Sequence, residues 1–167
     1  MNSILANIFL TVQNRLKTEV PALKWIDGDY GQLEFYENRP NVDFPCVLID
    51  IDDGTFSNNG EFSQLGECVL IIRLGLPSYS QTNALTPQPV IELALEYYNL
   101  EHAVNKALHG FQSQYFSTLS RVKADKEKRN DNLRVRTMRY TFTYADNTAM
   151  PVYTAPETGI DAEITTE

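Results

Sequence analysis

The sequence predicts an α+β domain from three patterns: two amphipathic helical stripes, two nearly apolar strands, and one strand that alternates apolar and polar residues. A chain of 167 residues suits one domain and buries about 70% of the surface that its unfolded form exposes. Hydrophobic residues make up 43% of the chain and aromatic residues 11%, which argues against disorder. No apolar run approaches the ~20 residues of a membrane span, and the N-terminus does not resemble a secretory signal. We therefore expect a soluble protein that is not exported.

The first element is an amphipathic helix that starts after Asn2 and Ser3, which can cap it, and ends near Pro21. Its apolar residues recur at three- and four-residue steps, at Ile4 or Leu5, Ile8, Phe9, Val12 and Leu16. Residues 23–36 mix apolar positions with the turn signal DGDYG. One or two short strands about a turn are expected there.

Two apolar strands follow, at residues 46–51 and 68–76, and we expect them to pair antiparallel. Pro45 stands at the start of the first strand because it cannot donate to a central ladder. Alternation places Val47, Ile49 and Ile51 on one face and Cys46, Leu48 and Asp50 on the other. Residues 52–67 contain three glycines and two adjacent asparagines, and predict a long loop.

The second long helix begins near Pro87 and Pro89, with Thr86 placed to cap it and Gly110 near its end. An interruption at Asn99 is an open alternative. Its apolar stripe comprises Val90, Leu93, Tyr97, Leu100, Val104, Ala107, Leu108 and Phe111.

Residues 115–124 predict an edge strand, and residues 134–144 predict a strand with clean alternation. The segment DKEKRNDN between them reads as a charged turn. One face of the alternating strand is expected to be buried, and it carries Met138, Tyr140, Phe142 and Tyr144.

The chain is expected to divide into a domain at 1–145 and an acidic C-terminal arm at 146–167. The arm has two prolines and no Lys or Arg, a composition that cannot bury enough apolar area to order itself. Its segment GIDAEITTE alternates Ile160, Ala162 and Ile164. This alternation predicts a strand that adds to the sheet edge of a neighbouring chain.

The charge distribution favours self-association or a charged partner. A net charge of -8 argues against a free-standing DNA or RNA binder. Residues 121–139 nevertheless hold eight Lys/Arg and three Asp/Glu, a net +5, which leaves -13 on the rest of the chain. This basic segment is interpreted as a solvated hairpin, as a DNA contact, or as a hairpin that meets the acidic surface of the next copy. The last reading fits the charges best, and head-to-tail contacts of that kind form rings when the rotation closes.

Two carboxylates on one strand face, Asp50 and Asp52, with Asp53 opposite, suggest a cation site that Glu61 and Glu67 could complete. The spacing lacks the EF-hand arrangement, and acidic residues commonly solvate the ends of strands. We therefore favour a structural role for these carboxylates, at the solvated end of the strand. A carboxylate-dependent metal enzyme that uses Asp50 and Asp52 remains an alternative.

Other catalytic signals are weak. His102 and His109 lie seven residues apart without an H-E-x-x-H pattern, and Cys46 and Cys68 lack C-x-x-C spacing and read as buried thiols. No G-x-S-x-G, P-loop or G-x-G-x-x-G motif is present. We therefore expect that the protein is not an enzyme and that it binds no cofactor and no metal.

Four stretches resemble the tail terminator (tail completion) family of tailed bacteriophages, over about residues 1–145. They are VPALKWIDGDYGQLE after the opening helix, FPCVLIDID, GECVLIIRLGL, and ALHGF followed by LSRVKADKEKRNDNLRVRTMRYTFTY. The resemblance implies a mixed, mainly antiparallel sheet of four to six strands with the two main helices packed on one face. The extended arm is longer than the family pattern.

What the resemblance implies for function is a ring, expected to be a hexamer, in the virion neck. Such a ring ends the tail tube and joins it to the head or connector, with DNA passing through the lumen, after assembly in the bacterial cytoplasm and without a membrane. Another neck or connector adaptor ring is an alternative. By analogy, the 52–67 loop and the 125–132 hairpin would contact partners. The candidate interface residues are Asp52, Asp53, Phe56, Asn58, Asn59, Phe62, Lys126, Lys128, Arg129, Arg134, Arg136, Arg139, Ile160 and Ile164.

Overall fold

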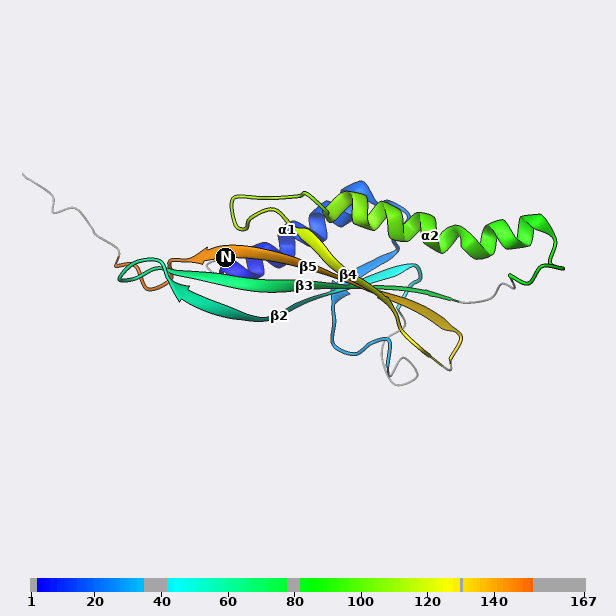
Figure 1. Ribbon diagram of the computed structural model, residues 1–167, viewed down its shortest axis with the longest axis horizontal. Coiled ribbons are helices and arrows are strands. Elements are labelled where there is room, and N and C mark those ends of the chain that lie inside the picture. The colour runs from blue at the N-terminus through cyan, green and yellow to red at the C-terminus, as the bar shows by residue number, and fades with distance from the viewer. Residues whose placement is uncertain (1–2, 35–41, 78–81, 130, 152–167) are drawn as a thin grey trace, which may run out of the picture.

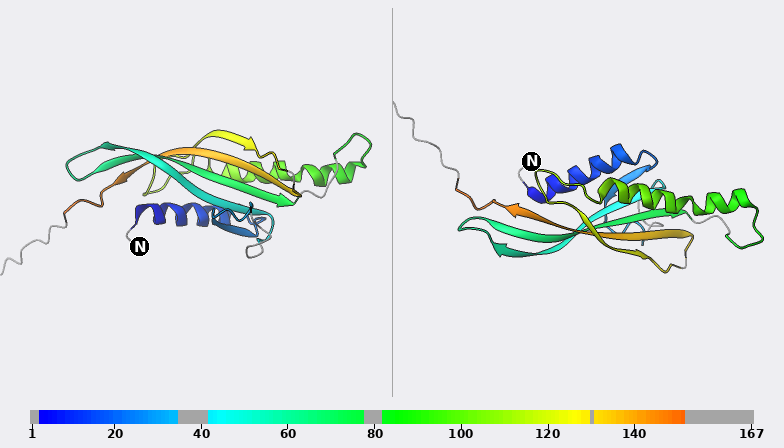
Figure 2. Two further views of the ribbon diagram at one scale, coloured as in Figure 1. Left: turned by 90° about the horizontal axis from the view of Figure 1, so that it is seen from below. Right: turned by 45° about the horizontal axis from the view of Figure 1, so that its top comes forward.

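The computed structural model describes residues 3–34, 42–77, 82–129 and 131–151, and within them it has two helices and one five-stranded sheet (Figure 1). The elements are α1 (Ile4–Glu19), β1 (Trp25–Gly28), β2 (Cys46–Asn58), β3 (Gln64–Pro77), α2 (Gln88–Leu108), β4 (Ser120–Lys126) and β5 (Leu133–Asp146). The strand order is β1-β2-β3-β5-β4. β1 is parallel to β2 and every other pairing is antiparallel. Both helices cover one face of the sheet (Figure 2), so the predicted α+β class is confirmed.

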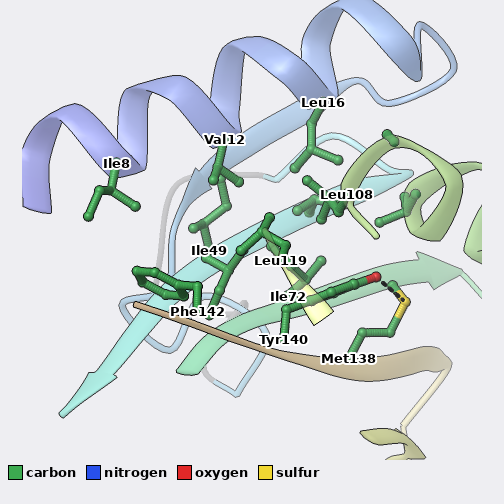
Figure 3. Packing of buried hydrophobic residues seen from close by; sticks show 14 of the residues in the cluster. Ile8, Val12, Leu16, Ile49, Ile72, Leu108, Leu119, Met138, Tyr140 and Phe142 are labelled. Atoms are coloured by element: carbon green, nitrogen blue, oxygen red, sulfur yellow. Dashed lines mark hydrogen bonds between the residues drawn. The ribbon is translucent and has the colours of Figure 1, made fainter. Parts of the chain in front are cut away.

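Helix α1 forms as its sequence pattern predicts. The Ser3 hydroxyl accepts a hydrogen bond from the Ala6 N–H at 3.4 Å and caps the helix. The residues at helical spacing, Ile8, Val12 and Leu16, are fully buried. They point from α1 towards the sheet (Figure 3).

The prediction of a loop over residues 52–67 is wrong, because β2 continues to Asn58 and β3 resumes at Gln64. A β-bulge between Asp52 and Thr55 takes up the extra residue in β2. A Cβ on Gly66 would come within 2.8 Å of the Tyr144 ring. Gly66 therefore marks a close approach inside the sheet and not a loop. The actual turn is short, and the Asn59 N–H donates to the Ser63 carbonyl at 2.9 Å.

The main core lies between the sheet and the two helices (Figure 3). Ile49 of β2, Ile72 of β3 and Tyr140 of β5 meet there and are 1% exposed or less. The Tyr140 hydroxyl lies 3.2 Å from the Asn105 amide oxygen of α2, so its polar end has a partner within the core. The alternation predicted for residues 46–51 and 134–144 is thus confirmed.

A second, smaller core lies on the opposite face of the sheet. It is formed by Leu33, Cys46, Leu48 and Val135, and partly buried residues from 25–44 and Leu133 pack against it. This cluster explains why the start of β2 is apolar on both faces. Trp25, Leu33, Val42 and Phe44, which all precede β2, therefore cover this face of the sheet.

Helix α2 runs without a break from Gln88 to Leu108, so the alternative interruption at Asn99 is wrong. Pro87 occupies the N-cap position, and no side chain caps this helix end, so the predicted cap by Thr86 is also wrong. Neither helix of the described chain is long and apolar enough to cross a membrane.

The edge strand is β4, which begins five residues later than predicted. Residues 110–119 form a compact connection in which the Gly110 N–H donates to the Leu119 carbonyl, and the Leu119 N–H donates to the Phe111 carbonyl. Gly110 has a φ of 83°, which favours glycine. Phe116 and Leu119 are buried by this connection, which explains why an apolar pattern precedes the strand itself.

Replacing Leu16 with alanine is expected to lower the free energy of unfolding by about 2–5 kcal/mol, because it leaves a cavity between α1 and the sheet. Leu10→Ala on the same helix is the matched control, since Leu10 is 38% exposed, and should cost less than about 1 kcal/mol. Urea denaturation measures both. Equal losses for the two variants would contradict the packing of α1 described above.

Candidate interaction surfaces

The described residues contain no group of three or more His, Cys, Asp and Glu side chains placed to hold a metal ion. Asp50 and Asp52 both lie on β2 and are exposed. His102 is exposed on α2, and the Nδ1 atom of His109 accepts the Arg121 N–H at 3.1 Å. The candidate catalytic and metal-binding residues are therefore not brought together in one site within this part of the chain.

The two cysteines are buried, as predicted, and belong to different cores. Burial raises the pKa of the Cys46 thiol to about 12. A thiol with that pKa is protonated at neutral pH and is a poor nucleophile. Cys46 thus serves as a packing residue.

Arg73 of β3 holds three carboxylates on the sheet face opposite the helices. Its guanidinium contacts both carboxylate oxygens of Glu127, at 2.9 and 3.0 Å, Asp29 at 2.9 Å, and Glu34. The Thr137 hydroxyl donates to Glu127 at 2.9 Å. Burial, the largest single influence on each group, lowers the pKa of Arg73 and raises that of Glu127. It is outweighed at Arg73 by the hydrogen bonds to Glu127, Glu34 and Asp29 together, and at Glu127 by those from Arg73, Thr137 and Arg129 together. The pKa of Arg73 is raised, the pKa of Glu127 is lowered, and both groups are charged at neutral pH.

Arg129 fixes the turn between β4 and β5. It donates to the Asp131 carboxylate at 3.0 Å, to Glu127 at 3.3 Å, and to the Leu33 carbonyl. The hydrogen bond from Arg129 lowers the pKa of Asp131. The turn is therefore clamped to the segment that covers the second core.

Three further arginines of the predicted interface also make contacts within the chain. Arg136 forms two hydrogen bonds of 2.8 Å with Glu101 of α2. Arg134 lies 4.0 Å from the centre of the Tyr97 ring and donates to a carbonyl of α2. Arg139 donates to Asp125 at 3.1 Å. These contacts tie β5 to α2 and to β4, and they leave Lys126 and Lys128 as the exposed members of the predicted basic set.

The acidic and aromatic members of the predicted set lie on β2 and in the β2–β3 turn. Asp52, Asn58 and Asn59 are exposed, and Phe56 and Phe62 are about half exposed. The Phe56 ring meets Tyr144 edge-on at 6.3 Å. The backbone of Asp53 lies in β2, whereas the Asp53 side chain, Ile160 and Ile164 fall outside what the structure describes. The β2–β3 turn, which carries Asn59 and Phe62, lies at the end of the sheet remote from the start of α2 (Figure 1).

The first half of α2 carries an apolar surface that the sequence reasoning missed. This half reaches beyond the ends of the strands (Figures 1 and 2). Leu93 is 65% exposed and Leu85, just before the helix, is 95% exposed, with Val90, Leu95 and Tyr98 also exposed. Val90 and Leu93 were predicted to face the core. The signal that points to this surface is that VIELALEYYNL is apolar on all sides of the helix, while the sheet can cover only one.

Beside this half-helix lies a groove of about 540 Å³. Its walls come from the end of α1 and the turn after it, from the end of β3, and from α2. Apolar side chains dominate the lining, including Val20, Leu76, Leu93 and Leu100, and Tyr97 and Arg134 lie on one wall. We name this feature the α2 groove. Exposed apolar surface of this kind is common where one protein contacts another.

Both borders of the sheet also include strand edges without a backbone partner among the described residues. β1 pairs only with Cys46–Ile49 of β2, so among the described strands residues 50–58 of β2 have a neighbour on one side only. β4 is the last strand at the other border. Open edges of this kind can accept a strand from another chain.

No family model matches the sequence, and no curated protein matches it. Among the solved structures that match, the fold is similar to that of a chain from the virion of a native gene transfer agent particle, with a TM-score of 0.52. The match covers 87% of this chain and 100% of that chain, at 10% sequence identity. At this identity the likeness shows a shared fold.

Glu127→Gln is expected to lower the free energy of unfolding at pH 7 by about 1–3 kcal/mol, because it weakens charged hydrogen bonds to Arg73 and Arg129. The folded pKa of Glu127 lies below its unfolded value. Its contribution is therefore complete above the unfolded pKa of about 4.3 and is lost as pH falls through the folded pKa. Denaturation curves between pH 7 and about pH 3 should show the two proteins converging in acid.

The exposed Glu67 of β3 offers the control for this experiment. Glu67→Gln should change stability by less than about 0.5 kcal/mol at each pH. A Glu127→Gln effect that grows as the pH falls would contradict the ion-pair network.

Proposed function

We propose that the protein is a structural component of a phage-like virion and that copies of it form a ring in the neck. In this role the ring ends the tail tube and joins the tail to the head or its connector, with DNA passing through the lumen. The observation that carries the proposal is the fold likeness to a virion chain, which spans nearly the whole of both chains. The order of elements that resembles the tail terminator family leads to the same role.

The surfaces of the chain support an assembly role. The described residues hold no cluster suited to a metal, whereas the α2 groove and two open strand edges suit contacts with other proteins. These features lie at different places on the molecule, as contacts with different neighbours would need. A net charge of -8 also suits a channel for DNA, because repulsion keeps the duplex from adhering as it slides.

A second candidate is another neck or connector adaptor ring. The α2 groove favours it, because an apolar surface that projects beyond the sheet suits the docking of a different protein. An adaptor would use the same ring but would meet its foreign partner through the first half of α2. Leu93→Glu should then block partner binding and leave the ring intact.

Native mass spectrometry combined with negative-stain microscopy tests the ring. With rising protein concentration, the chain is expected to form closed rings with a central hole and one defined number of subunits. The same result is expected with magnesium and with EDTA, because the proposed role uses no metal. A chain that stays monomeric at every soluble concentration and binds a metal tightly would contradict the proposal and favour the carboxylate alternative at Asp50 and Asp52.

Removing residues 152–167 tests the role of the arm. The truncated chain keeps every contact described above and should retain its thermal transition. Its sequence loses the alternating Ile160 and Ile164, so assembly is expected to need a protein concentration about tenfold higher if this segment pairs with a neighbour. Sedimentation velocity measures the shift. Truncated and full chains that assemble at the same concentration would refute a role for this segment.

A further inference from the structure

We propose that the sheet continues from one copy to the next by pairing of two edges. The open edge of β2, residues 50–58, would receive β4, Ser120–Lys126, of another copy. Each subunit then offers one edge and accepts the other, which is a head-to-tail contact. This edge pairing depends on the proposed function in one respect only, which is that the successive subunits close into a ring.

The β2 edge presents its backbone to a neighbour after β1 ends. The Asp29 N–H donates to the Ile49 carbonyl at 2.9 Å, so the backbone of Ile49 faces away from β3. Strand alternation gives Ile51 the same direction. Among the described residues, no backbone hydrogen bond outside the β2–β3 pairing reaches Asp50, Ile51 or residues 54–58. These outward N–H and C=O groups form a template for another strand.

The β4 edge is the counterpart on the other border. The Glu127 N–H donates to the Val135 carbonyl at 3.1 Å, which fixes which residues of this hairpin face β5. By alternation, Asp125 and Lys123 face β5, and Ala124 and Lys126 direct their backbone groups outward. All but one residue of β4 are exposed. The Arg121 N–H already donates to His109 Nδ1, and the residues that follow it, 122–126, fit within the nine of the open β2 segment.

The two edges carry opposite charge. Residues 50–58 contain Asp50 and Asp52, with Asp53 beside them, and no Lys or Arg. β4 contains Arg121, Lys123 and Lys126 against a single acidic residue, Asp125, which pairs with Lys123 at 3.0 Å and leaves the strand with a net positive charge. Exposed ion pairs contribute little affinity, but they select the partner and its orientation.

The β2 edge is acidic and the β4 edge has an excess of basic residues, so net charge favours pairing of unlike edges over pairing of like edges. A two-fold dimer through identical edges is thereby disfavoured, and the unlike pairing is selected. Lysine on an edge strand commonly prevents aggregation. In this protein the β2 edge of another copy carries carboxylates that can pair with these lysines. The β4 edge can therefore still accept that one partner while its lysines disfavour others.

The edges are also offset along the strands. The register places Lys123 level with Arg139, Ile71 and Asp50. β1 covers β2 up to Ile49, so an incoming β4 must pair further along, towards Asn58. Each subunit is then shifted along the strand direction relative to the last. A constant shift of this kind is the shear that a sheet needs to close on itself.

Charge reversal on each edge tests the pairing. The acidic variant, Lys123→Glu/Lys126→Glu, has two acidic edges, and the basic variant, Asp50→Lys/Asp52→Lys, has two basic edges. Each alone should remain monomeric where the wild type assembles, and an equal mixture should restore assembly with the two variants alternating. Lys17→Glu/Lys106→Glu, with both changes on the helices, is the control and should assemble like the wild type. Circular dichroism and thermal melting establish that each variant is folded.

Hydrogen exchange separates backbone pairing from other contacts. In the wild-type assembly, peptides covering residues 50–58 and 120–126 should exchange about tenfold or more slowly than in the acidic variant, because their outward amides become bonded. Peptides at the start of α2 provide the internal comparison. Slower exchange there alone would place the contact in the α2 groove and overturn the edge pairing.

The possible outcomes distinguish this inference from the proposed function. Closed rings without protection of either edge would keep the ring and overturn the edge pairing. Open filaments with both edges protected would support the edge pairing and overturn the ring, because head-to-tail contacts that fail to close give filaments. Single variants that assemble like the wild type, or a wild type that stays monomeric, would overturn the edge pairing.

Discussion

The antiparallel pairing of β3 with β5 is the constraint on which the rest of the structure depends. The pairing runs along both strands, from Gln64 opposite Asp146 to Pro77 opposite Leu133. Because these two strands fill the middle of the sheet, the helices pack over them, and β2 and β4 become their outer neighbours. β1 protects only the first residues of β2. The long central pair therefore produces both the core and the two unprotected borders that the assembly model uses.

Arginine and lysine side chains play different parts in this protein, and the difference follows from the chemistry of their charged groups. Arginine supplies the internal contacts: Arg73 gathers three carboxylates, Arg129 fixes a turn, and Arg136 binds Glu101 through two parallel hydrogen bonds. The planar guanidinium suits such fixed, multiple contacts, whereas lysine is a compact and strongly hydrated charge. Lys123, Lys126 and Lys128 stay on the surface, where Lys123 pairs with Asp125 at 3.0 Å. The positive charge available to a partner is thus smaller than the sequence total and is concentrated on β4 and the turn after it.

Much of the fold could be predicted because hydrophobic periodicity reports burial directly, as the stripe of α1 and the alternation of β5 show. The failures have local causes. Gly54 and Gly66 have the composition of a loop, yet they lie where neighbouring side chains leave no room for a Cβ. Val90 and Leu93 continue a helical stripe past the end of the sheet that would have covered them. Arg136 belongs to the predicted interface, yet it already binds Glu101. The two residues are 35 positions apart in sequence, so only the tertiary fold reveals this contact.

The fold and the proposed contacts are connected through the sheet borders. The same pairing that builds the core leaves strand edges without a neighbouring strand in the part of the chain that the structure describes. Electron cryomicroscopy of the assembled protein tests this connection most directly. We expect a closed ring in which β4 of each subunit lies against residues 50–58 of the next, so that one sheet runs around the ring. A ring whose subunits meet only through their helices, with both strand edges facing solvent, would contradict it.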